Sequence, residues 1–212
     1  MLKNIYVIVA IVGFSGLMNA QPKEFKAVSD ESAFRKKFAD AANSIQTIKS
    51  DFIQEKNLNV LSEKIISKGE FSFKKQNMVR MEYNIPFKYL MVINKDKVMI
   101  KDEQKTNTFS SKSNKLFEQI NKIIIDCVQG TAMDNKDFNV NVFESDNQYF
   151  LMLSPNKKDL KEFFSTINIY IEKKDYSVHK MDMNEPSGDN TVITFVNKQF
   201  NVNIPDAVFA VK

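Results

Sequence analysis

The sequence predicts a mainly β protein in which about ten antiparallel strands and two amphipathic helices form a single domain. Two observations predict this fold class. Apolar and polar residues alternate in many short runs, and two longer stretches repeat their apolar residues every three or four positions. A twisted sheet of so many consecutive strands bends, so we expect it to curl into a barrel or half-barrel.

The chain begins with a segment typical of a secretory signal peptide, at residues 1–20. One lysine precedes an apolar run from Ile5 to Leu17, and the segment closes on Ala20 before a polar stretch. A retained membrane anchor is the alternative, but the run is short for a hydrocarbon layer of roughly 30 Å. We therefore expect cleavage near Ala20-Gln21, export to the periplasm, and one mature domain over residues 21–212.

The first helix is predicted from Ser29 to about Ile48, with Ser29 or Asp30 as its cap. Its apolar residues, at three- and four-residue steps, are Phe34, Phe38, Ala41, Ala42, Ile45 and Ile48. Alternating sequence then predicts five or more strands joined by tight connections. The alternating runs lie at 48–54, 69–74, 79–83, 89–93 and 98–100.

A second helix is predicted to interrupt the strands. Ser111 or Ser113 can cap it, and Gly130 ends it. Its apolar stripe consists of Leu116, Phe117, Ile120, Ile123, Ile124 and Cys127. Beyond this helix, alternation predicts further strands at 138–142, 149–153, 166–171, 178–183 and 191–196.

The composition narrows the classes of function. The formal net charge of +4 is small and interspersed, so no nucleic-acid partner is expected. The single cysteine, Cys127, excludes an internal disulfide framework and lies far from the expected cleavage site, so we expect no lipid-anchored mature N-terminus. Eighteen Phe and ten Met, without Trp, supply large and adaptable apolar surface. Such surface suits an ordinary core and equally a cavity for ligands of variable form.

Catalytic motifs are not evident in the sequence. His179 is the only histidine, and no nucleophile motif, phosphate-binding glycine loop or cysteine pair accompanies it. Cys127 is expected to be a small buried hydrophobe. On an alternating strand His179, Met181 and Met183 would share one face and could bind Cu(I), but methionines on a strand face also line cores and cavities. We expect no enzyme activity, no cofactor and no metal site.

Five segments resemble the LolA family of periplasmic outer-membrane lipoprotein carriers. They are Phe-Ile-Gln at 52–54, Gly-Glu-Phe-Ser-Phe-Lys-Lys-Gln-Asn at 69–77, Arg-Met-Glu-Tyr-Asn-Ile-Pro at 80–86, Val-His-Lys-Met at 178–181 and Phe-Asn-Val-Asn-Ile-Pro-Asp-Ala-Val-Phe at 200–209. The resemblance covers essentially the whole mature chain in element order. It implies an incomplete antiparallel barrel of about 10–11 strands, with helices as a lid over a hydrophobic cavity.

The resemblance also implies a function and partners. The protein would be a monomeric chaperone that receives acylated lipoproteins from an inner-membrane ABC-type release complex, hides their acyl chains and carries them to the outer membrane, where a receptor can take them over. Each buried methylene contributes about 0.8 kcal/mol, so acyl chains need a shielding surface to cross water.

The same resemblance implies three sets of site residues. The acyl-chain cavity is expected to include Phe52, Phe71, Phe73, Met81, Tyr83, Met99, Met181 and Met183. The lid helix is expected to present Leu116, Phe117, Ile120 and Ile124. The basic residue that latches the lid in the family corresponds to Lys75, and Arg80 is the alternative latch.

Two other binding functions fit the same half-barrel shape. The protein could sense lipids or lipoproteins, or it could carry a small hydrophobe. We favour the carrier because a receptor is expected to carry its own N-terminal lipid anchor and a sensor an additional partner-binding domain.

Overall fold

The computed structural model describes residues 24–75, 77–113 and 115–211. Within these ranges twelve strands form one antiparallel sheet, in the order β1-β8-β9-β10-β11-β12-β2-β3-β4-β5-β6-β7. The sheet is open, because β1 and β7 are its two edges. The predicted signal peptide at residues 1–20 and its cleavage site lie outside the described residues.

Two meanders, β2 to β7 and β8 to β12, make up most of the sheet, and the pairing of β12 with β2 joins them. The strands are β1 (Lys26–Ala27), β2 (Thr47–Leu58), β3 (Glu63–Lys74), β4 (Met78–Ile85), β5 (Tyr89–Asn94), β6 (Lys97–Lys101), β7 (Thr106–Ser110), β8 (Phe138–Glu144), β9 (Gln148–Pro155), β10 (Thr166–Glu172), β11 (Val178–Asn184) and β12 (Asn190–Phe200). The helices are α1 (Glu31–Ser44), α2 (Lys115–Gln129) and α3 (Lys158–Lys161), with short 3-10 helices η1 (Ser111–Ser113), η2 (Ala132–Asp134) and η3 (Asp206–Phe209).

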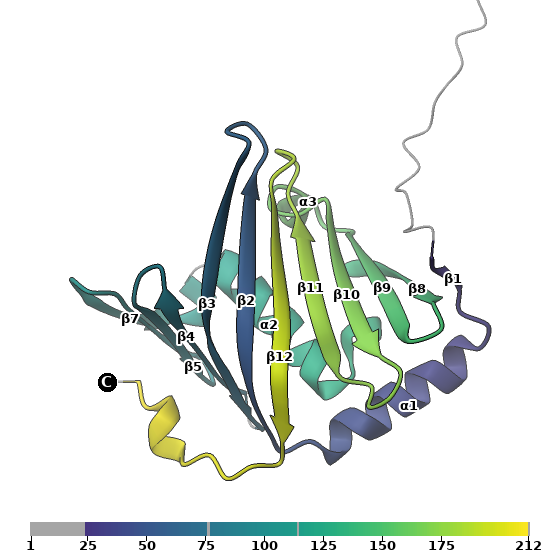
Figure 1. The fold of residues 1–212 in the computed structure, drawn as a ribbon, viewed down its shortest axis with the longest axis horizontal. Helices are drawn as coiled ribbons and strands as arrows, with labels where there is room; N and C mark the ends of the chain where they lie inside the picture. The colour runs from purple at the N-terminus through teal and green to yellow at the C-terminus, as the bar shows by residue number, and fades with distance from the viewer. Residues whose placement is uncertain (1–23, 76, 114, 212) are drawn as a thin grey trace, which may run out of the picture.

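The predicted half-barrel with helices over one face is confirmed. The sheet curves, and α2 lies behind the central strands β2, β12 and β11 with α1 beside it (Figure 1). The described residues contain more strands than the 10–11 expected, because two edge strands carry weak sequence signals. β1 has only two residues, and β7 reads Thr-Asn-Thr-Phe-Ser with little apolar alternation.

Helix α1 begins where the sequence predicts and ends earlier. The carboxylate of Asp30 caps it by accepting a hydrogen bond from the amide of Ala33 at 2.9 Å. The helix ends at Ser44 because Ile45 adopts an extended conformation, after which β2 starts at Thr47. The buried side of α1 carries Phe34, Phe38 and Ala42.

Helix α2 ends at Gly130, as predicted, and the structure gives that glycine a second role. Its φ of +72° is the left-handed conformation that glycine adopts without strain. A Cβ atom at this position would also lie 2.9 Å from Cα of Ala39 and 2.9 Å from the carbonyl oxygen of Phe38. Gly130 therefore lets the end of α2 approach α1 closely, so that the two helices pack together over the sheet.

The core on the helix-covered face of the sheet has two parts, and α2 bridges them. Ile123 and Cys127 pack into a cluster with β8 to β11, which includes Leu151, Ile167 and Ile169. On the same helix, Ile124 and Val128 pack against a cluster on β2 to β6, which includes Phe52, Phe71, Phe73, Val79 and Met81. A helix that contacts both halves of the sheet covers the hollow between them.

The opposite face of β4, β5 and β6 is covered by the C-terminal segment. Met78, Val92 and Met99 pack there with Ile204 and Phe209. The neighbours of Met99 along β6, Val98 and Ile100, point to the helix-covered face instead. The prediction that Met99 faces the cavity is therefore wrong, because its position in the alternation of β6 places it on the other side of the sheet.

Among the helices of the described residues, none combines the length and apolar character needed to cross a membrane.

Candidate functional site

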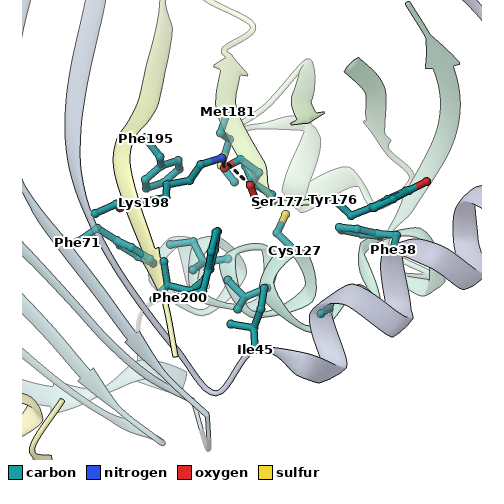
Figure 2. Close-up of a pocket in the computed structure, with 16 residues that line it drawn as sticks. Phe38, Ile45, Phe71, Cys127, Tyr176, Ser177, Met181, Phe195, Lys198 and Phe200 are labelled. Atoms are coloured by element: carbon teal, nitrogen blue, oxygen red, sulfur yellow. Dashed lines mark hydrogen bonds between the residues drawn. The ribbon is translucent and has the colours of Figure 1, made fainter. Parts of the chain in front are cut away.

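An apolar cavity of about 60 Å³ lies between the two helices and the sheet (Figure 2). The helices contribute Phe38, Ala42 and the adjacent Ile45 from α1, with Ile124, Cys127 and Val128 from α2. The sheet and its turns contribute Ile48, Ser50, Phe71, Tyr176, Ser177, Val178, Met181, Phe195, Lys198 and Phe200. The cavity is thus formed where α1 and α2 meet the centre of the sheet, at the pairing of β12 with β2.

A β-bulge in β12 determines which of its side chains reach the cavity. The pairing with β2 shifts between Val196 and Gln199, where β12 contains one extra residue. Asn197 lies at this bulge with a φ of +54°, and its Nδ2 donates to Oδ2 of Asp51 at 2.7 Å. The bulge reverses the alternation, so Phe195, Lys198 and Phe200 all line the cavity.

A second irregularity separates the residues of the predicted copper motif. The register of β10 and β11 shifts between Tyr170 and Ile171. As a result Val178, and not His179, lines the cavity with Met181. Nδ1 of His179 lies 3.3 Å from a carboxylate oxygen of Glu172. The expectation that His179 shares a face with the two methionines is therefore wrong.

Lys198 is the charged residue of the cavity wall. Its side chain is 11% exposed, and its Nζ donates to Oγ of Ser177 at 2.6 Å and to the carbonyl oxygen of Val178 at 3.2 Å. A carboxylate oxygen of Glu172 lies 3.9 Å away. Burial lowers the pKa of Lys198, against the opposing effects of Glu172 and Asp175.

Ser50 places a second polar group in the wall. It belongs to β2, directly across from the bulge that carries Lys198. The residue is 3% exposed, and its hydroxyl has no hydrogen-bond partner in the described part of the chain. A buried hydroxyl without a partner is costly, so its persistence in the wall of an otherwise apolar cavity suggests a use for it.

The eight residues predicted for the cavity divide into three groups. Phe71 and Met181 line it. On the same face, Phe52, Phe73, Met81, Tyr83 and Met183 belong to the surrounding clusters. Tyr83 donates to Oε1 of Gln54 at 2.9 Å, and burial raises its pKa to about 12. Met99 is the exception described above.

The predicted lid residues are placed on α2. Ile124 lines the cavity, whereas Ile120 packs against the cluster on β8 to β11 and lines a separate pocket of about 210 Å³ with Phe163 and Met183. The side chains of Leu116 and Phe117 lie outside the described residues.

The two predicted latch residues have different surroundings. Nζ of Lys75 donates to the carbonyl oxygen of Asn43, in the last turn of α1, at 2.7 Å. Lysine bound to a carbonyl at a helix C-terminus satisfies a group that the helix itself leaves unpaired. Arg80 instead pairs with Glu82 at 2.7 Å, on strand positions that alternate with those of Val79 and Met81. The geometry brings Lys75 to the helices and keeps Arg80 away from them.

Several cavity residues were absent from the predicted set. Phe38 and Cys127 are predicted only as members of the apolar helix stripes. Those stripes are the signal that could have placed the two residues at the cavity. Lys198 and Phe200 carry no such signal, because the parity of a strand after a bulge cannot be read from alternation. Tyr176 comes from the turn between β10 and β11 with a φ of +56°.

Cys127 contributes a buried thiol to this wall. Burial raises the pKa of the Cys127 thiol, which is 4% exposed, so the thiol is held protonated and unreactive. Among the residues that the structure describes, no group of three or more His, Cys, Asp or Glu side chains could hold a metal ion.

The family model described as "Outer membrane lipoprotein carrier protein LolA" matches residues 43–212. No curated protein sequence matches the chain.

Several solved structures resemble this chain at low sequence identity. The crystal structure of MucB has a TM-score of 0.50 at 12% identity, over 87% of this chain and 64% of that chain. A LolA superfamily protein from Nitrosomonas europaea has a TM-score of 0.45 at 9% identity, over 84% of this chain and 97% of that chain. The Mycobacterium tuberculosis lipoprotein LppX has a TM-score of 0.45 at 9% identity, over 83% and 100%. At 12% identity the likeness to MucB concerns the fold alone.

Proposed function

The chain belongs to the LolA family of outer membrane lipoprotein carrier proteins, and we propose that it is a periplasmic carrier of acylated lipoproteins. It takes them from an inner-membrane ABC-type release complex, holds their acyl chains against the helix-covered face of the sheet, and carries them to the outer membrane. The role is one of binding and release, without catalysis.

The observation that carries the proposal is the apolar cavity beneath α1 and α2, where α2 bridges the two halves of an open sheet. A chain of sixteen carbons contains about fifteen groups worth ~0.8 kcal/mol each, so shielding it from water is worth on the order of 12 kcal/mol. A wall of Phe, Ile, Val and Met side chains supplies that shielding without fixing the shape of the ligand.

The cavity volume requires that the helices move. An engineered apolar cavity of about 150 Å³ takes benzene, and the present cavity of about 60 Å³ is smaller still. An acyl chain therefore enters only when α2 leaves the sheet. The chain then replaces the contacts that Ile124, Cys127 and Val128 give up, so occupancy favours the open form and an empty cavity favours the closed one.

Polar contacts at three points oppose this movement. Lys75 holds the end of α1, and Nε2 of Gln129 at the end of α2 donates to Oδ1 of Asn77 at 3.2 Å, so both tie a helix to the connection between β3 and β4. In the middle of α2, Nζ of Lys122 donates to Oδ1 of Asn135 at 2.9 Å and to Oδ2 of Asp137 at 3.1 Å. Such contacts set the balance between closed and open forms without making the closed form permanent.

The proposal is tested by identifying the cargo that the protein binds. The full chain is expressed with its own N-terminus, purified from the periplasm and analysed by mass spectrometry, and it is then incubated with inner-membrane vesicles that contain an acylated lipoprotein. We expect co-purified acylated lipoprotein and its withdrawal from the vesicles in soluble complex.

A matched pair of variants controls for non-specific binding to exposed apolar side chains. Phe200 lines the cavity, whereas Phe87 is 74% exposed at the turn between β4 and β5. Phe200→Glu should abolish the withdrawal of lipoprotein from the vesicles. Phe87→Glu leaves the cavity unchanged and should therefore withdraw lipoprotein like the wild type. A wild-type protein that carries no acylated species and withdraws none contradicts the proposal.

The small volume of the closed cavity favours one second candidate, a carrier of a small hydrophobe. Such a ligand would fit with much less movement of α2 than an acyl chain requires. Solvent extraction of the same purified protein separates the two, because a small apolar molecule without an acyl chain would be recovered in place of lipoprotein.

A further inference from the structure

We propose that Lys198 and Ser50 form a polar subsite inside the cavity that binds the oxygen of an acyl group, so that the ligand's chain lies along the apolar wall with its carboxyl end at Lys198. The inference rests on the proposed function and deepens it, because it assigns a chemical class and an orientation to the ligand.

The first support is the position of Lys198. Lysine is rarely buried unless it is paired. Here the bulge at Asn197 directs the side chain to the cavity and not to the outer face of the sheet. Had β12 continued without the extra residue, Gln199 would have taken an inward position and Lys198 an outward one. Bulges that re-aim side chains are recurrent beside binding sites.

The second support is the unused hydrogen-bonding capacity at this point. An ammonium group has three donors, and in the described residues Nζ of Lys198 has two partners within hydrogen-bond distance, both of them uncharged. Ser177, the nearer partner, donates its own proton to Asp175 at 2.6 Å. The hydroxyl of Ser50 has no partner in that part of the chain. An acyl oxygen would accept from both groups.

The third support is that the nearest carboxylate pairs with Lys198 only at long range. Oε1 of Glu172 is 3.9 Å from Nζ of Lys198, beyond hydrogen-bond distance, while Nζ of Lys174 is 2.5 Å from Oε2 of the same carboxylate. Glu172 is therefore shared with Lys174, and its ion pair with Lys198 leaves the third donor of the ammonium group without a hydrogen-bond acceptor among the described residues. An incoming carboxylate or carbonyl oxygen would supply the missing acceptor in a setting where charge-assisted hydrogen bonds are strong.

Two sources can present such an oxygen: the carboxylate of a free fatty acid, and the ester carbonyl of an acylated lipoprotein. We use palmitate and methyl palmitate as probes for the two, and N-phenyl-1-naphthylamine as an apolar probe without an acyl oxygen. Binding is measured by fluorescence of the naphthylamine and by its displacement. The variants are Lys198→Met, Lys198→Gln and Ser50→Ala, each checked for an unchanged cooperative melt.

The control is Lys49→Met, which makes the same charge change on β2. Lys49 lies beside Ser50 but points to the outer face, where its Nζ is 3.6 Å from Glu70 and its side chain is 52% exposed. Lys198→Gln keeps a donor for Ser177 while removing the charge, so it tests the subsite even if the methionine variant loosens the turn between β10 and β11.

We expect Lys198→Met to weaken palmitate at least about tenfold, the effect of losing a hydrogen bond to a charged group. The naphthylamine affinity should stay within about twofold, and Lys49→Met should resemble the wild type. A matching loss for methyl palmitate assigns the subsite to acyl esters; a loss for palmitate alone assigns it to free carboxylates.

The inference is overturned if Lys198→Met and Lys198→Gln bind both acyl probes as tightly as the wild type. That result leaves the proposed carrier function intact as long as the naphthylamine and acylated lipoprotein still bind. A wild type that binds none of these ligands defeats the proposed function itself, so the two failures are distinguishable.

Discussion

Replacing Lys75 by methionine is expected to make the cavity open more often. Methionine keeps the apolar stem of the side chain and removes the ammonium that donates to the carbonyl oxygen of Asn43 at 2.7 Å. One charge-assisted hydrogen bond at a solvent-accessible position is worth about 1 kcal/mol. If the bond exists only in the closed form, its loss raises the population of the open form about fivefold.

Cys127 provides the assay. It is the single cysteine of the sequence, it lines the cavity and it is 4% exposed. A thiol reagent under native conditions therefore modifies it only when α1 or α2 moves away from the sheet, and the labelling rate follows the open population when opening and closing are fast. Lys75→Met should be labelled about five times faster than the wild type, with a melting temperature only slightly lowered.

Arg80→Met is the matched control. Arg80 pairs with Glu82 on the other side of the sheet, so its loss should leave the labelling rate of Cys127 unchanged. The latch argument is refuted if Lys75→Met is labelled at the wild-type rate, or if Arg80→Met accelerates labelling to the same degree.

Three further changes test the fold around the site. Ile124→Glu, at the cavity, should leave a cooperative melt by circular dichroism but abolish cargo binding, whereas Leu151→Glu, on β9 at a position 0% exposed, should unfold the domain; equal effects would remove the distinction between lid and core. Gly130→Ala should lower the free energy of unfolding by at least about 1 kcal/mol in urea, because of its positive φ and its contact with α1; a neutral result would contradict the close approach. Hydrogen bonds from Lys173 and the amide of Ser29 lower the pKa of Glu144 to about 2, below its unfolded value of 4.5, so stability from this group is present above pH 4.5 and is lost as the pH falls toward 2; Glu144→Gln should flatten that part of the pH profile, and an unchanged slope would contradict it.

Local pattern determined the secondary structure and one face of the core. Period-two alternation places Phe71 and Phe73 on the same side of β3, and a glycine after the apolar stripe marks the end of α2. These properties depend on neighbours a few positions away, which is why a single sequence was sufficient for them. The number of strands predicted the curl of the sheet, and the family resemblance added the expectation that the helices act as a lid.

The tertiary structure alone decided which groups meet at the cavity. Alternation does not say which side of β6 faces the helices, and the C-terminal segment that covers Met99 comes from more than a hundred residues away. Each bulge resets the parity of its strand, so Lys198 enters the cavity and His179 does not. The distance between Lys75 and α1 and the small closed volume depend on the packing of remote segments, and packing is a property of the whole fold, not of any local run of sequence.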